Sequence, residues 1–368
     1  MVDSIPKTNA RFARAYEIVN RAVHEEIFPG CAFAVLADGK SLLSDAVGRF
    51  TYDPDARSVA TSTLFDIASV TKVVATTAAA MLLHQRGQLD LELHLGELLP
   101  GFVVGREDSR LARRITLRHL LAHNSGLPGY VEFFRVAKTP AELLRKCLEL
   151  PVEAEPGMRM EYSDPGFILL GKAIEVLVRE PLNSWVAREI FKPLSMHSTG
   201  FNPPASLRTL IPPTEFDERL RHRVVQGDVQ DENAFLLKGV AGHAGLFSNS
   251  YDLILFAKAI LAARTKSEES TLFHSETVDL FAERQQPDGS SRALGWDTPS
   301  EESSAGKLFS AHSIGHLGYS GCSLWIDREA KVAIVLLSNR TWPNRSEQSQ
   351  KGIKALRPAF HDAIREAL

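Results

Sequence analysis

The strongest constraint on the fold is the segment of residues 70–87, VTKVVATTAAAMLLHQRG. Apolar and small residues dominate it on every side, and it ends at Gly87, as glycine is common at the end of a helix. A helix without a polar face is stable only where other elements cover most of its surface. We therefore expect the rest of the chain to enclose this helix, and 44% hydrophobic residues over 368 positions supply ample material for such a core.

Strand patterns lie near both ends of the chain. Residues 30–48 predict a hairpin with its turn at Asp38-Gly39. Residues 316–327, HLGYSGCSLWID, predict an apolar strand interrupted by glycines, and residues 331–339, KVAIVLLSN, predict another. Helices are expected at 9–27, 115–126, 165–180, 250–264 and 346–368. The pattern favours a sheet domain of residues 1–80 and 240–368 around a mostly helical domain of residues 81–239.

Two connections are predicted to have little regular structure. Residues 202–214 contain two Pro-Pro pairs and are expected to be extended. Residues 284–312 are rich in glycine, serine and proline and are expected to form a surface loop.

The composition excludes several classes of function. A net charge of −3 argues against a nucleic-acid partner, which normally meets a clustered basic surface. The three cysteines are scattered and form no CxxC pair, so neither a disulfide framework nor a zinc ribbon is expected, and a reducing, cytoplasmic location is favoured. No window of about 18 apolar residues predicts a membrane span, and the N-terminus lacks a signal-peptide pattern.

Three Ser-x-x-Lys matches occur, at Ser4, Ser69 and Ser304. Only Ser69 opens a long apolar helix, where side chains three residues apart share a face. Such a helix would hold the Ser69 hydroxyl beside the Lys72 amine, the geometry that a serine nucleophile needs. To accept a proton, Lys72 must be partly neutral, and we expect burial to lower its pKa. The structural alternative is a helix-capping serine followed by a solvated lysine.

Two further segments carry chemistry. In MEYSDPGFILLG, Tyr162 is a candidate proton shuttle, and Asp164 is expected to cap the helix that Pro165 begins. In IGHLGYSGCSLWID, Gly318 and Gly321 allow a ligand to approach the backbone. The amide of Tyr319 could then join the Ser69 amide in an oxyanion hole. The structural alternatives are a half-buried tyrosine and a bulged edge strand.

The three segments, in this order, resemble the motifs of serine β-lactamases and penicillin-binding proteins. The version with tyrosine in the second motif is closest to class C β-lactamases and related esterases. FDIASVTK, ITLRHLLAHNSGLP and DENAFLLKGVAGHAGLFSN fit the same resemblance, which covers about residues 10 to 365. It implies an α+β fold, with an antiparallel sheet flanked by helices and a cleft beside a helical domain. It also implies an acyl-enzyme on Ser69, with Lys72 and Tyr162 moving protons and no cofactor or metal.

Two residues depart from the family pattern. Asp164 stands where the family usually has Asn, and an ionised carboxylate only accepts hydrogen bonds. His316 stands where the third motif often has Lys, so a fixed cation for a substrate carboxylate is lost. Both departures argue against efficient β-lactam hydrolysis.

The function that follows is a serine hydrolase of small esters or amides, with Asp164, His316, Gly318 and Tyr319 contacting the substrate. A D-amino-acid peptidase or transpeptidase and a non-catalytic binding protein that kept the fold stay open. The oligomeric state is left open.

Other patterns are weaker. Residues 166–173 nearly match a phosphate-binding loop, but their apolar interior favours a buried helix. His119 and His123 have metal-pair spacing without a third ligand and are expected to be packed histidines. His243 could line the cleft, but a structural turn is the favoured interpretation. Asp231, Glu232 and Asn233 could contact the substrate, but an ordinary polar loop is favoured.

Overall fold

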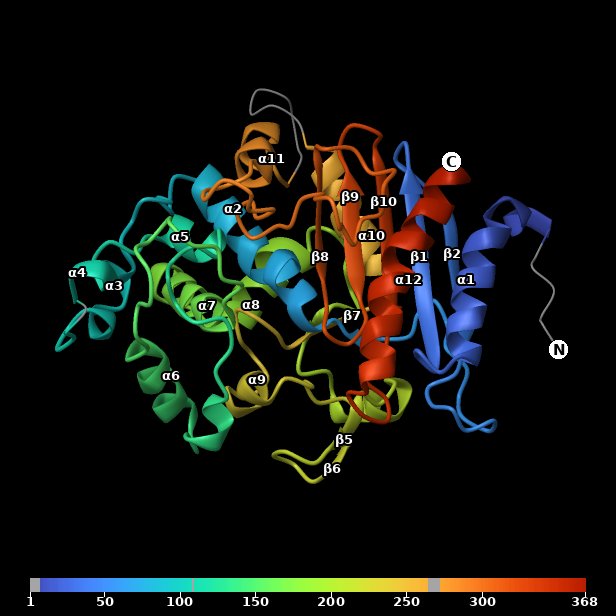
Figure 1. The fold of residues 1–368 in the computed structure, drawn as a ribbon, viewed down its shortest axis with the longest axis horizontal. Coiled ribbons are helices and arrows are strands. Elements are labelled where there is room, and N and C mark those ends of the chain that lie inside the picture. Colours follow the sequence, from blue (N-terminus) through green and yellow to red (C-terminus); the bar gives the residue numbers. More distant parts are fainter. Residues whose placement is uncertain (1–6, 108, 264–271) are drawn as a thin grey trace.

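The computed structural model describes residues 7–107, 109–263 and 272–368, and its centre is a five-stranded antiparallel sheet (Figure 1). The strand order is β2-β1-β10-β9-β8, so two strands from the N-terminal part of the chain lie beside three from the C-terminal part in one sheet. The strands are β1 (Gly30–Ala37), β2 (Lys40–Gly48), β8 (Ser313–Leu317), β9 (Ser323–Asp327) and β10 (Val332–Ser338). The predicted α+β class and antiparallel sheet are confirmed.

The two predicted strand regions differ in outcome. The first is a hairpin as expected, and Asp38 and Gly39 both adopt left-handed φ angles of 47° and 74° at its turn. The second was predicted as one interrupted strand, and that is wrong. Residues 318–322 form a turn between β8 and β9, which pair with each other. The glycines therefore mark a hairpin turn.

Side chains that alternate along β1 enter two different cores. Phe33 and Val35 pack with helices α1 (Ala13–His24) and α12 (Glu347–Glu366), which lie side by side on one face of the sheet (Figure 1). Ala32 and Ala34 belong to the larger core on the other face. Because both faces are covered, every residue of β1 is buried.

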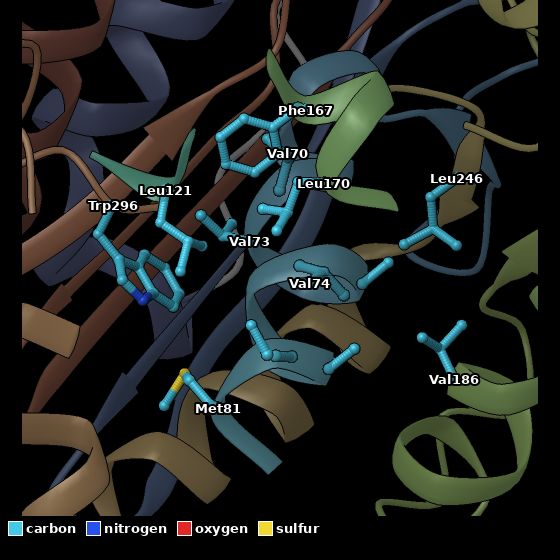
Figure 2. Packing of buried hydrophobic residues seen from close by; sticks show 14 of the residues in the cluster. Val70, Val73, Val74, Met81, Leu121, Phe167, Leu170, Val186, Leu246 and Trp296 are labelled. Carbon is cyan, nitrogen blue, oxygen red and sulfur yellow. The ribbon is translucent and has the colours of Figure 1, made fainter. Parts of the chain in front are cut away.

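The apolar segment after Ser69 lies inside the larger core. It runs without a break through a 3₁₀ turn (Ala68–Val70), a π-helical segment (Lys72–Thr77) and helix α2 (Ala78–Gln85). No residue from 72 to 82 exposes any surface. Figure 2 shows Val70, Val73 and Met81 among side chains from several other elements. The enclosure that the sequence predicts is present, although the helix is only partly of the α type.

The remaining elements surround these layers. Helices are α3 (Leu95–Leu98), α4 (Ser109–Ala112), α5 (Leu117–Leu121), α6 (Pro140–Leu148), α7 (Asp164–Val178), α8 (Leu182–Val186), α9 (Glu232–Leu236), α10 (Ser250–Leu261) and α11 (Ser275–Ala282). Two small sheets combine β3 (Phe65–Asp66), β7 (Leu246–Ser248) and β4 (Gly200–Phe201), and β5 (Glu215–Asp217) with β6 (Arg223–Val225). No helix of the described residues is both long and apolar enough to cross a membrane. The division into two domains at residues 80 and 240 stays a prediction.

Several predicted boundaries are wrong in detail. The helix expected over 115–126 ends at Leu121, and part of the expected extended connection is a 3₁₀ helix, Ala205–Leu210. The loop of residues 284–312 is not purely a surface loop, because Leu294 and Trp296 are completely buried in the larger core. The helix cap expected at Asp164 belongs to Ser163, whose hydroxyl accepts the Gly166 N–H at 3.0 Å. This shift of one residue leaves the Asp164 carboxylate free for another partner.

Phe33 is expected to contribute strongly to the stability of the core between the sheet and its outer helices. Its ring meets the rings of Tyr16 and Phe360 edge-on, each with 5.5 Å between centroids. Phe33→Ala should lower the free energy of unfolding by about 3–5 kcal/mol in urea denaturation, because it opens a cavity in a closed core. Phe216→Ala, at a phenylalanine that is 48% exposed, is the control and should change it by about 0.5 kcal/mol or less. Equal effects of the two variants would contradict this account.

Candidate active site

A cleft of about 570 Å³ collects the three predicted motifs. Its walls include the turn of residues 68–70, which begins the apolar helical segment of residues 70–85 (the buried helix). The start of α7 and the end of β8, with the turn that follows, also line it. The predicted site residues that line it are Ser69, Tyr162, Asp164, His316, Gly318 and Tyr319. Lys72 does not line the cleft itself but is buried next to Ser69. Segments up to about 250 residues apart in sequence therefore meet in one place.

The Lys72 ammonium sits at the centre of this arrangement. It is completely buried, and its Nζ donates to Ser69 Oγ at 3.0 Å, Asp164 Oδ1 at 2.6 Å and the carbonyl oxygen of His243 at 3.2 Å. Three acceptors match the three N–H bonds of an ammonium group. Lys72 is therefore held as a positioned cation against the Ser69 hydroxyl.

The expectation that Lys72 has a lowered pKa is wrong. Burial does lower the pKa of Lys72, but the Asp164 carboxylate at 2.6 Å, with a smaller contribution from Tyr162, raises that pKa above its ordinary value. Burial of Lys72 can be expected from the sequence, whereas the Asp164 carboxylate, 92 residues away in the chain, meets Lys72 only in the folded protein. Lys72 is thus protonated in the free protein.

The Tyr162 ring is surrounded by other candidate groups. Lys72 Nζ lies 4.8 Å and the Arg292 guanidinium carbon 5.0 Å from its centroid. The His123 ring lies 4.5 Å and the His316 ring 6.0 Å away, measured between centroids. Two cations and two imidazoles therefore enclose the phenol.

His123 holds the second motif in place. Its Nδ1 accepts the backbone N–H of Ser163 at 3.0 Å, and its ring stacks on Phe167 at 4.9 Å. Burial, followed by the charges of Arg292 and Lys72, holds the pKa of His123 well below its ordinary value, so the ring is neutral. His119 instead caps α5 together with Thr116. Among the described residues no group of three histidine, cysteine or acidic side chains could hold a metal ion.

The turn that carries Ser69 is fixed from both sides. Asp66 Oδ1 accepts the N–H of Ala68 at 2.8 Å, and Ala68 has a left-handed φ of 46°. Gly318 packs so closely here that a Cβ on it would lie 2.4 Å from the Ile67 carbonyl oxygen. Within the described residues, the backbone N–H groups of Ser69 and Tyr319 donate to no protein acceptor. These are the two amides that the sequence predicts for an oxyanion hole.

His316 is a neutral residue in this structure. It is buried on β8, and its Nδ1 lies 2.8 Å from the Leu317 carbonyl oxygen. Burial, then the charges of Lys72 and Arg292, hold the pKa of His316 well below its ordinary value. The loss of the motif lysine therefore leaves an uncharged ring at this position.

Arg292 supplies a cation that sequence reasoning missed. It lines the cleft from the loop of residues 284–312, beside Tyr162, and its Nε lies 3.9 Å from Asp297 Oδ1. The composition of that loop predicts surface structure. The buried sequence Ala-Leu-Gly-Trp directly after Arg292 was the available signal that the loop returns to the core.

The segment of residues 230–246 packs beside Lys72 and includes residues that line the cleft. Asp231 caps α9 and lies 2.9 Å from His243 Nε2, and the interaction with His243 lowers the pKa of Asp231 to about 2 although burial opposes it. Asn233 is structural, with bonds to Phe134 N–H and the Val131 carbonyl oxygen. His243 is more than a turn residue, because its carbonyl oxygen binds Lys72.

Two glycines let this segment reach Lys72. A Cβ on Gly242 would lie 2.1 Å from the Phe167 carbonyl oxygen, and one on Gly171 would lie 2.9 Å from the Gly242 Cα. The segment thus passes between α7 and the buried helix, where Gly242 also accepts the Thr76 hydroxyl at 2.7 Å. Residues 166–173, the near match to a phosphate-binding loop, are a helical part of α7.

The other Ser-x-x-Lys matches are not at the cleft. Ser4 lies outside the described residues. Ser304 accepts the Trp325 indole N–H at 3.3 Å, on the side of the sheet where α12 packs, and Lys307 is exposed.

Comparison with known proteins agrees with this fold. Residues 17–357 match the protein family described as Beta-lactamase. The chain belongs to the beta-lactamase family.

Relatives within this beta-lactamase family carry the names of hydrolases. One is an N-acetylmuramyl-L-alanine amidase of Bacillus subtilis (strain 168), 32% identical over 346 residues, which are 85% of this chain and 77% of the relative. Another, from Escherichia coli (strain K12), is named as a D-alanyl-D-alanine carboxypeptidase and is 32% identical over 76% of this chain and 70% of its own length. The solved structure of EstCE1, a hydrolase with promiscuous acyltransferase activity, shares the fold with a TM-score of 0.76 at 20% identity, over 95% of this chain and 99% of that one.

Asp164→Asn should lower the pKa of Lys72 below its ordinary value, by on the order of one to three pH units. Asparagine removes the negative charge that opposes burial, while it keeps the shape of the side chain. The measurement is an NMR titration of protein labelled with ¹³C at the lysine Cε. Asp297→Asn, at another carboxylate of the cleft, is the control and should leave the titration unchanged. An unaltered Lys72 titration in Asp164→Asn would refute the dominant role of this ion pair.

Proposed function

We propose that the protein is a serine hydrolase that forms an acyl-enzyme on Ser69 and acts on small esters or amides. The observation that carries the proposal is the 3.0 Å contact between Lys72 Nζ and Ser69 Oγ in a cleft that Tyr162 also lines. A serine hydroxyl beside a lysine and a tyrosine in one cleft can support acyl transfer to serine. Membership of a family with amidase and carboxypeptidase relatives supports the same reaction class.

In this proposal Tyr162 acts in its deprotonated form, and the phenolate oxygen accepts the proton of Ser69 as the hydroxyl attacks the substrate carbonyl. Lys72 is already protonated, so it serves as the hydrogen-bond donor that orients Ser69 Oγ and stabilises charge. The ammonium of Lys72 and the guanidinium of Arg292 are close enough to stabilise negative charge on the phenol. Tyr162 then gives the proton to the leaving group and later activates the water that releases the acyl product.

The free amides of Ser69 and Tyr319 complete the proposed mechanism. They would bind the oxygen of the tetrahedral intermediate, where one donor is typically worth about 100- to 1000-fold in rate. The close packing of Gly318 against the Ile67 carbonyl oxygen, next to the turn that carries Ser69, supports a joint role for the two amides.

Ser69→Ala should abolish acylation by p-nitrophenyl acetate and labelling by a fluorophosphonate probe, because the attacking oxygen is gone. Intact-mass spectrometry of the labelled protein locates the adduct. Ser304→Ala, at the other described Ser-x-x-Lys match, is the control and should label like the unaltered protein. Undiminished turnover by Ser69→Ala would refute the assignment. If the unaltered protein carries no adduct with any ester or probe, the hypothesis of a non-catalytic binding protein takes its place.

A second candidate, a D-amino-acid peptidase, is favoured by uncompensated cations in the cleft. Arg340 and Arg357 are buried and donate to the carbonyl oxygens of the 318–322 turn, at 2.8 Å and at 2.7 to 2.8 Å. Burial lowers the pKa of Arg340, and it lowers that of Arg357 to about 10. Neither of them, nor Lys354 beside them, forms an ion pair with a described residue. A free C-terminal carboxylate would provide the missing counter-charge.

Lys354→Met should therefore raise KM by about 5- to 30-fold for an acyl-D-Ala-D-Ala peptide with a free carboxylate. The same variant should leave hydrolysis of the C-terminally amidated peptide unchanged, since that peptide has no charge to lose. Lys351→Met, one turn earlier on α12 where Lys351 pairs with Glu347 at 2.6 Å, is the matched control. Steady-state kinetics that show no preference for the free carboxylate would exclude this candidate.

A further inference from the structure

The side-chain amide of Gln230 is buried at the cleft without a hydrogen-bond partner among the described residues. It lines the cleft and is 3% exposed, and neither its Oε1 nor its Nε2 has a hydrogen-bond partner among the described residues. A buried primary amide without partners is costly, and native proteins rarely leave both of its atoms unpaired. A ligand in the cleft is positioned to supply those partners.

The backbone of Gln230 is fixed relative to the nucleophile. Its N–H donates to Asp66 Oδ2 at 2.6 Å, and the other oxygen of the same carboxylate accepts the Ala68 N–H at 2.8 Å. Arg221 donates to its carbonyl oxygen at 2.5 Å. One buried carboxylate therefore joins the turn before Ser69 to the residue whose amide is free. Asparagine in place of Asp66 could not do this, because it has a single acceptor atom.

The neighbouring polar groups are already engaged. Asp164 binds Lys72, and Asp231 binds Ala234 N–H and His243. Glu232 forms ion pairs with Arg345 at 2.9 Å and Arg219 at 3.1 Å. Of the described side chains on this wall, Gln230 is the one that retains both a free donor and a free acceptor.

We propose that the side-chain amide of Gln230 recognises an amide group in the acyl part of the substrate. A primary amide can donate from Nε2 to a substrate carbonyl oxygen and accept a substrate N–H at Oε1, so the two groups are complementary. The inference rests on the proposed acylation of Ser69. It narrows the substrate class to acylamino or peptide compounds. A site built to hydrogen-bond a polar group strongly rejects an analogue that lacks it, because its own groups then stay unpaired.

Three p-nitrophenyl esters of equal chain length test the proposal. N-acetylglycinate carries the amide, 4-oxopentanoate replaces its N–H with CH₂, and pentanoate lacks both polar groups. Each kcat/KM is divided by the spontaneous hydrolysis rate of the same ester. In the unaltered protein we expect the N-acetylglycinate to be favoured over the pentanoate by about 10- to 100-fold, with the 4-oxopentanoate between them.

Gln230→Met should reduce this preference at least about tenfold and leave the pentanoate rate within about twofold. The pentanoate rate also reports that the variant is folded. Gln350→Met is the matched control, because Gln350 lines the same cleft from α12 but is exposed. It should keep the preference of the unaltered protein.

The outcomes separate the two levels of the proposal. If Ser69 is acylated but Gln230→Met keeps the full preference, the amide-recognition proposal is overturned and the hydrolase assignment stands. An equal loss for all three esters would show a structural role for Gln230 and overturn it as well. If no ester acylates Ser69 in the unaltered protein, the hydrolase assignment fails, and the proposal falls with it.

Discussion

The site depends on one buried ammonium and the carboxylate that keeps it charged. Lys72 has no exposed surface, and an isolated charge at that depth would lose its proton or destabilise the fold. Asp164 at 2.6 Å, with the hydroxyl of Ser69 and the carbonyl of His243, makes the charged form stable. Each of these partners comes from a different segment, so the site forms only when the buried helix, α7 and the segment before β7 have packed together.

The fold serves this requirement through its layers. The sheet and its outer helices α1 and α12 make one core, and the buried helical segment belongs to the larger core on the other side of the sheet, where α10 contacts the strands (Figures 1 and 2). Ser69 therefore lies where this apolar helical segment reaches the cleft beside the end of β8. Its hydroxyl reaches the cleft, whereas the residues that follow it are closed off from water.

The sequence predicts the elements and motifs well but not the interactions between distant residues. Ser69, Lys72 and Tyr162 could be recognised because each lies in a local pattern. The choice between Ser163 and Asp164 as helix cap could not be made, since both residues cap helices well and only the distant Lys72 selects between them. Arg292 and the pKa of Lys72 were missed for the same reason, because both depend on contacts made in three dimensions.

The close contact of Gly171 with Gly242 has a consequence for how such a protein can diversify. A single methyl group there would push the His243 carbonyl away from the ammonium, so this part of the interior tolerates almost no change. Exposed side chains of the β5–β6 hairpin, such as Phe216 and Val224, meet no such restriction, whereas Arg221 of the same hairpin holds the Gln230 carbonyl oxygen. Substitutions are therefore expected to accumulate at the exposed positions, while the glycine contact stays unchanged.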